Sequence, residues 1–123
     1  MQSILFDTDF LIDFLRGKSS SLAVITHAFS ENQAYISILS VYELYAGMRP
    51  GEEEATADCI GAFRIEPLTF DISKKAGMRR FKYRQKGVTL SNINCIIAET
   101  ARTRNHLIAT MNTKHYPDVK FYK

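Results

Sequence analysis

Cysteine is scarce in this sequence, and long hydrophobic runs are missing from it. Cys59 and Cys95 are the two cysteines among 123 residues. They are too few for a disulfide framework or a cysteine zinc site, so we expect reduced thiols in a cytoplasmic protein. No uncharged run approaches the ~20 apolar residues that a membrane helix needs. Asp7 and Asp9 interrupt the first apolar stretch, which therefore lacks the form of a signal peptide.

Short apolar strands alternate with helical patterns, without repeats, low-complexity tracts or linkers. At this length we expect one domain, 1–123, with a single core. Strands are predicted at residues 4–6, 34–36, 63–68, 107–110 and, as a short final strand, 119–122. Because strands and helices alternate, we predict an α/β fold of three layers, α/β/α, with a central, mostly parallel sheet.

The predicted helices are placed by their capping residues. Ser40 is the expected N-cap of a helix that has Glu43 in its first turn. Asp71 is the expected cap of the helix over residues 72–86, and Ser91 is the expected cap of the helix after it.

Charge is divided unevenly along the chain. Residues 1–71 hold four Lys or Arg and eleven Asp or Glu, whereas residues 72–123 hold twelve and two. This asymmetry suggests a polyanionic partner for the basic half and a cation for part of the acidic half, although two ordinary solvated surfaces would explain it equally well.

Four polar residues follow predicted strands or begin predicted helices. Asp7 and Asn112 come directly after strands, Glu43 lies in the helix after the second strand, and Asn94 begins the helix capped by Ser91. In a parallel sheet these ends point the same way. Acidic side chains gathered without Arg or His favour a hard cation such as Mg²⁺ or Mn²⁺.

Two of these residues also have purely structural interpretations. Asp is a good N-cap, so Asp7 could serve only to begin a helix. A glutamate in the first turn, as expected for Glu43, would stabilise the helix by complementing its dipole. The residues by themselves leave both alternatives open.

The stretches ILFDTDFLID, SILSVYELYAGMR, GVTLSNINCIIAETA and LIATMNTKHYP together cover almost the whole chain. In content and order they resemble the PIN-domain ribonucleases, in particular the VapC-type toxins of toxin–antitoxin pairs. The resemblance implies a PIN-like fold and hydrolysis of RNA phosphodiester bonds by a water that Mg²⁺ or Mn²⁺ activates. It also implies inhibition by a small antitoxin protein, and homodimer formation.

Carried over by position, Asp7 and Glu43 match the first two acidic residues of the family. Asn94 stands where the family pattern L-S-x-x-D-x-x-I-A has its third acid, and Asn112 matches a fourth polar position that would orient a water or a second ion. The resemblance therefore implies Asp7, Glu43 and Asn94 as metal ligands. Neighbouring residues that could reach the metal's waters or the substrate are Thr8, Asp9, Lys114 and His115.

Asn94 is a departure from the family with a physical consequence. An asparagine keeps a carbonyl oxygen of similar shape, but it removes one negative charge and adds a donor. We expect catalysis to fall by ~10²-fold or more, by analogy with the loss of other preorganised electrostatic groups. An engineered inactive form, which we favour, and a natural member with little or no activity both explain this residue.

The basic helix over residues 72–86 is expected to contact RNA or an acidic antitoxin segment, and a solvated face is the alternative. The candidate contacts are Lys75, Arg79, Arg80 and Lys82. Two other functions are weighed: a non-catalytic RNA- or partner-binding module, and a phosphatase of the haloacid-dehalogenase type. ILFDTD resembles the first motif of those phosphatases, but Leu11 stands where that motif has threonine.

Overall fold

A parallel sheet of four strands, in the order β3-β2-β1-β4, forms the centre of the computed structural model, which describes residues 2–17, 19–31 and 33–122. The strands are β1 (Ser3–Phe6), β2 (Ala34–Ser37), β3 (Arg64–Glu66) and β4 (His106–Ala109). In the central strand, Leu5 lies opposite Tyr35 of β2 and Ile108 of β4. Because all strand pairs are parallel, the carboxyl ends of the strands meet at one edge.

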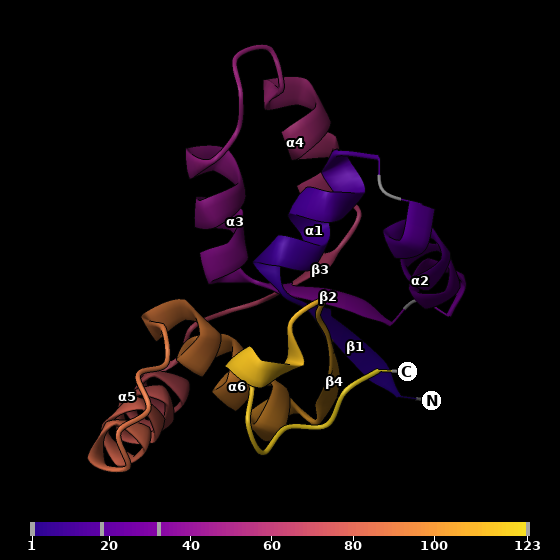
Figure 1. Ribbon diagram of the computed structural model, residues 1–123. Helices are drawn as coiled ribbons and strands as arrows, with labels where there is room; N and C mark the ends of the chain where they lie inside the picture. The colour runs from indigo at the N-terminus through magenta and orange to yellow at the C-terminus, as the bar shows by residue number, and fades with distance from the viewer. Residues whose placement is uncertain (1, 18, 32, 123) are drawn as a thin grey trace.

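Helices cover both faces of this sheet, as Figure 1 shows. On one side lie α1 (Thr8–Leu15), α2 (Ser19–Ser30), α3 (Ile38–Ala46) and α4 (Glu53–Gly61), and on the other lie α5 (Phe70–Gln85) and α6 (Asn92–Arg104). A short 3₁₀ helix, η1 (Thr113–His115), follows β4. The predicted α/β fold with helices on both faces of a parallel sheet is confirmed.

The central strand β1 is buried on both faces. Ile4 and Phe6 pack with residues of α1 to α4, whereas Leu5 packs with residues of α6. Leu5 and Phe6 have no exposed surface. This pattern is typical of parallel strands covered on both sides, which is why β1 reads as an unbroken apolar run.

Two predicted helix starts are wrong by a few residues. The N-cap of α3 is Ser37, whose side chain accepts the Leu39 N–H at 3.0 Å, so Ser40 lies inside the helix and Glu43 in its second turn. The N-cap of α5 is Thr69 and not Asp71. Ser37 and Thr69 both have extended backbone dihedrals. The backbone conformation, and not the residue type alone, therefore decides where a helix begins. Ser91 caps α6 as predicted.

The outer strands are shorter than the sequence predicts. The expected strand at residues 63–68 is limited to β3, and the expected final strand is a single bridge between Ile108 and Phe121. No helix in the described part of the chain is long and apolar enough to cross a membrane.

The two-sided burial of β1 predicts that replacing a leucine in this strand costs much more stability than replacing an exposed leucine. Leu5→Ala should lower the free energy of unfolding by about 2–5 kcal/mol, because it leaves a cavity where the side chain is fully buried. Leu22, which is 54% exposed on α2, is the matched control. Leu22→Ala should change stability by about 0.5 kcal/mol or less. Urea unfolding measures both, and equal losses would contradict the burial assigned to Leu5.

Candidate active site

The site lies where the order of the strands reverses. From β1 the chain proceeds to β2 and β3 on one side, and it then crosses to β4 on the other side of β1. In open α/β sheets, ligands bind at the carboxyl ends of the strands beside such a reversal. Asp7 directly follows β1, and Thr110 directly follows β4. The Asp7 N–H donates to the Ala109 carbonyl at 3.1 Å, which fixes the two strand ends side by side.

Asp7 is the centre of the site, and its two carboxylate oxygens have different roles. Oδ1 accepts the Phe10 N–H at 2.9 Å and so caps α1. Oδ2 accepts hydrogen bonds from the Thr110 hydroxyl at 2.5 Å and from the Tyr116 hydroxyl at 3.3 Å. Asp7 is therefore a helix cap, and its second oxygen is directed to the candidate active site.

The electrostatics of Asp7 favour a cation. Burial raises the pKa of this carboxyl, which is 3% exposed, above its usual value. Hydrogen bonds from Thr110, the Phe10 N–H and Tyr116 lower it, and the charge of Asp9 raises it further. The cost of burying the charge thus exceeds the effect of these hydrogen bonds, and a bound cation would stabilise the ionised form.

Glu43 is held in place from the neighbouring helix. The Thr8 hydroxyl, at the start of α1, lies 2.5 Å from Glu43 Oε1 and 3.0 Å from Ser40 Oγ. Because a hydroxyl has a single proton, Thr8 donates to the carboxylate and accepts from Ser40. Ser40 is fully buried and Thr8 is 6% exposed, so this pair fixes the position of Glu43, which is half-buried on α3.

Tyr116 joins Asn94 to Asp7. Its hydroxyl lies 3.0 Å from Asn94 Oδ1 and 3.3 Å from Asp7 Oδ2, so both acceptors surround one donor. Burial raises the pKa of Tyr116, and the negative charges of Asp7, Asp9 and Glu43 raise it further. Asp7 and Asn94 thus share the Tyr116 hydroxyl, and Glu43 is joined to them through Thr8, the residue that follows Asp7.

Other residues expected at the site are connected to Asp7 less directly or are exposed. Asn112 donates its backbone N–H to Thr110 Oγ1 at 3.0 Å, and its side-chain amide lies 3.2 Å from His115 Nε2. Lys114 is exposed on η1, and Asp9 is exposed in the first turn of α1. Asn112 is therefore connected to Asp7 through Thr110.

Sequence reasoning missed three residues of this arrangement. Thr110 was expected only as the end of a strand, Ser40 only as a helix cap, and Tyr116 was not singled out at all. Thr110 had a usable signal, since a hydroxyl at the end of a strand beside Asp7 is well placed to bind a carboxylate. Tyr116 had no such signal in the sequence, because only the tertiary fold brings its side chain to Asp7 and Asn94.

The polar side chains at this site offer oxygen donors, which are the ligands that a hard cation prefers. Among the described residues, no three His, Cys, Asp or Glu side chains form a group that could hold a metal ion. Asp7 and Glu43 provide two carboxylates, and Asn94 provides an amide oxygen at the third position. Ligands that are all oxygen fit Mg²⁺ or Mn²⁺. With only two charges, the expected affinity is lower than with three.

This fold and site define the class of protein. Residues 4–121 match the model of the PIN domain family, and the chain belongs to that family. It is related to the VapC ribonuclease toxins: it is 32% identical to Ribonuclease VapC10 of Mycobacterium tuberculosis over 114 residues, which cover 93% of this chain and 86% of VapC10. It is 27% identical to Ribonuclease VapC19 of the same species, over 92% of this chain and 91% of VapC19.

Solved structures show the same fold. A toxin–antitoxin complex from Klebsiella pneumoniae contains a chain that is 26% identical, with a TM-score of 0.77 over 94% of this chain and 92% of that one. VapBC2 from Rickettsia felis, bound to a DNA fragment from its promoter, has a TM-score of 0.81 at 17% identity and covers 98% of both chains. The second likeness shows the fold alone.

The bridging role of Tyr116 predicts the effect of removing its hydroxyl. Tyr116→Phe keeps the ring, which is 1% exposed, but removes the donor to the buried Asp7 carboxylate and to the half-buried Asn94 amide oxygen. We expect the free energy of unfolding to fall by about 1–3 kcal/mol in urea unfolding.

Tyr83→Phe is the matched control, because the Tyr83 hydroxyl also donates to an aspartate, Asp118, at an exposed position. Tyr83→Phe should lower the free energy of unfolding by about 1 kcal/mol or less. An equal or larger loss in Tyr83→Phe would contradict the role assigned to Tyr116.

Proposed function

We propose that this protein is a metal-dependent endoribonuclease that acts as the toxin of a toxin–antitoxin pair. The observation that carries the proposal is that Asp7 and Asn94 share one hydroxyl at the reversal point of the sheet, while Thr8, the residue after Asp7, holds the Glu43 carboxylate. Membership of the PIN domain family supports it, as do relatives that are named ribonucleases. The reaction proposed is hydrolysis of RNA phosphodiester bonds.

In this proposal Asp7 and Glu43 hold Mg²⁺ or Mn²⁺, with Asn94 as a weaker third ligand. Such an ion, when bound, stabilises negative charge on the phosphate and lowers the pKa of a water. The residues of the chain supply the preorganisation. Thr110 and Tyr116 orient Asp7 Oδ2, while Thr8 orients the Glu43 carboxylate.

We propose that Asn94 impairs the reaction without disturbing the fold. Its Oδ1 already accepts a hydrogen bond from Tyr116, and an aspartate there could accept the same bond. What the asparagine lacks is the third negative charge. Removal of one preorganised electrostatic group commonly reduces rates by ~10²–10³-fold, and we expect a deficit of that order here.

The proposed protein partner is a cognate antitoxin. The support is that solved structures with this fold are of a toxin–antitoxin complex and of a VapBC assembly. A homodimer is likewise proposed, on the basis of the family resemblance.

RNA cleavage tests the proposed activity. Asn94→Asp should raise the rate of Mg²⁺- or Mn²⁺-dependent cleavage by about 10²-fold or more over the parent chain, because it restores the third charge. EDTA should abolish this cleavage. Adding Asp7→Asn to Asn94→Asp should abolish it too, because the central carboxylate is lost.

The alternatives give different results in the same assay. If the parent and Asn94→Asp are equally active, the impairment is contradicted but the nuclease is not. If both are inactive on several RNAs while folded, the nuclease is contradicted and a non-catalytic binding module is favoured.

Metal binding can be tested independently of activity by thermal unfolding. In EDTA, Asn94→Asp should unfold at a lower temperature than the parent, because a third carboxylate is placed near Asp7 and Glu43. Mg²⁺ should raise its unfolding temperature more than that of the parent, since a ligand present at 100 times its Kd adds about 2.7 kcal/mol. Equal shifts in the two proteins would contradict a role for residue 94 in metal binding.

A further inference from the structure

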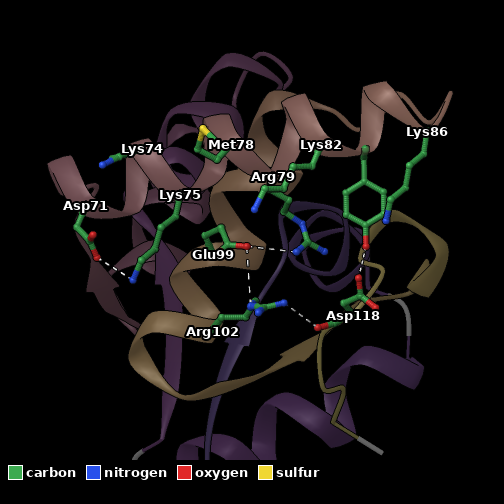
Figure 2. Close-up of a pocket in the computed structure, with 11 residues that line it drawn as sticks. Asp71, Lys74, Lys75, Met78, Arg79, Lys82, Lys86, Glu99, Arg102 and Asp118 are labelled. Carbon is green, nitrogen blue, oxygen red and sulfur yellow. Dashed lines mark hydrogen bonds and ion pairs between the residues drawn. The ribbon is translucent and has the colours of Figure 1, made fainter.

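A pocket separate from the candidate active site lies between α5, α6 and the segment that follows Tyr116 (Figure 2). Its volume is about 540 Å³. Six of the side chains that line it are cationic: Lys74, Lys75, Arg79, Lys82, Lys86 and Arg102. Three are acidic, and Met78 is the one aliphatic side chain among the lining residues.

The positive charge of this pocket is only partly neutralised. Lys75 pairs with Asp71 at 3.0 Å, and Arg102 lies 3.9 Å from Glu99. Lys74 and Lys82 are exposed about two turns apart on α5 and form no ion pair with any residue in the described part of the chain. They remain available for an anionic ligand.

Arg79 lies at the base of the pocket and is 7% exposed. One guanidinium nitrogen, Nη1, donates to Glu99 Oε2 at 3.2 Å, and Nη2 donates to the Pro117 carbonyl. Its Nε is the one buried side-chain nitrogen or oxygen without a hydrogen-bond partner among the described residues. Because nearly all buried polar groups in native proteins are hydrogen-bonded to protein, water or ligand, a water or a ligand atom at the base of the pocket would complete the contacts of Arg79.

We propose that this pocket binds the phosphodiester backbone of single-stranded RNA. Phosphate oxygens are strong acceptors for Arg and Lys, and a basic groove that follows the backbone is typical of single-strand binding. A protein segment fits less well, because interfaces depend on aromatic and apolar anchors. Met78 is the one aliphatic side chain that lines the pocket, and the Tyr83 ring already lies 5.3 Å and 5.4 Å from the charged groups of Arg79 and Lys86.

The pocket is connected to the candidate active site. Arg79 and Tyr83 bind Pro117 and Asp118, which directly follow Tyr116, the residue that contacts Asp7 and Asn94. An RNA strand in the pocket is therefore held beside the segment that completes the carboxylate site. This inference rests on the proposed ribonuclease function and adds to it a second substrate contact.

The test is RNA binding in EDTA, where cleavage plays no part. The probe is a fluorescent oligouridylate of about 12 nucleotides, a length that such grooves accommodate, and fluorescence anisotropy is measured over a range of salt concentrations. The pocket variant is Lys74→Gln with Lys82→Gln. The matched control is Arg84→Gln with Lys120→Gln, which removes the same charge at exposed positions that do not line the pocket.

Each phosphate contact on a single strand makes the fall of log K with log salt steeper by about 0.7. The pocket variant loses two such contacts, so it should bind about 25-fold more weakly than the parent at ~0.1 M salt. The magnitude of the slope of log K against log salt should fall by about 1.4, and it should stay near the parent value in the control. The Arg79 Nε–H resonance of the parent should also shift when the RNA is added. Thermal unfolding verifies that the variants are folded.

Three results would overturn the inference: equal weakening in both variants, no weakening in either, or binding of an Asp/Glu-rich peptide that the pocket variant loses while RNA affinity is unchanged. The last result would assign the pocket to a protein partner. If Asn94→Asp fails to cleave RNA but the pocket variant still loses affinity, the proposed activity fails and the pocket stands.

Discussion

The structure depends on one buried carboxylate at the end of its central strand. Asp7 is 3% exposed, yet it ends β1, caps α1 and accepts hydrogen bonds from Thr110 and Tyr116. Burial of a charge is tolerated when hydrogen bonds and an opposite charge accompany it. The hydrogen bonds are present, while the raised pKa shows that they do not compensate fully. In the proposed function, a bound cation would provide the opposite charge that Asp7 lacks.

The segment after β4 connects the two sites of the molecule. Tyr116 reaches the carboxylates on one side, while Pro117 and Asp118 are bound by α5 on the other. Arg79, which makes one of these contacts, is also paired with Glu99 of α6 at 3.2 Å. The α5–α6 pocket and the Tyr116 hydroxyl are therefore joined by direct contacts that do not pass through the sheet.

The sequence predicted the sheet, the place of Asp7 and the Ser91 cap, because periodicity, strand ends and caps are encoded locally. It failed where the answer depends on tertiary contacts. Ser40 has the chemistry of a cap, but Ser37 is the residue at which the backbone leaves the extended conformation, and Ser40 instead supports Thr8 across two helices. Arg79 was expected as a surface contact, whereas its guanidinium is buried against Glu99. The basic helix pattern could not show which of its cations face a pocket.

The division of charge along the chain becomes a division in space. The acidic first half builds α1 to α4 and places Asp7 and Glu43 at the sheet edge, while the basic second half builds α5 and α6 on the opposite side (Figure 1). A group of carboxylates repels a phosphate backbone, so a nuclease with such a site needs cations nearby. Charges at the surface are screened within about 8 Å at physiological salt. The proposed RNA-binding pocket between α5 and α6 would place cations within this distance of the RNA backbone.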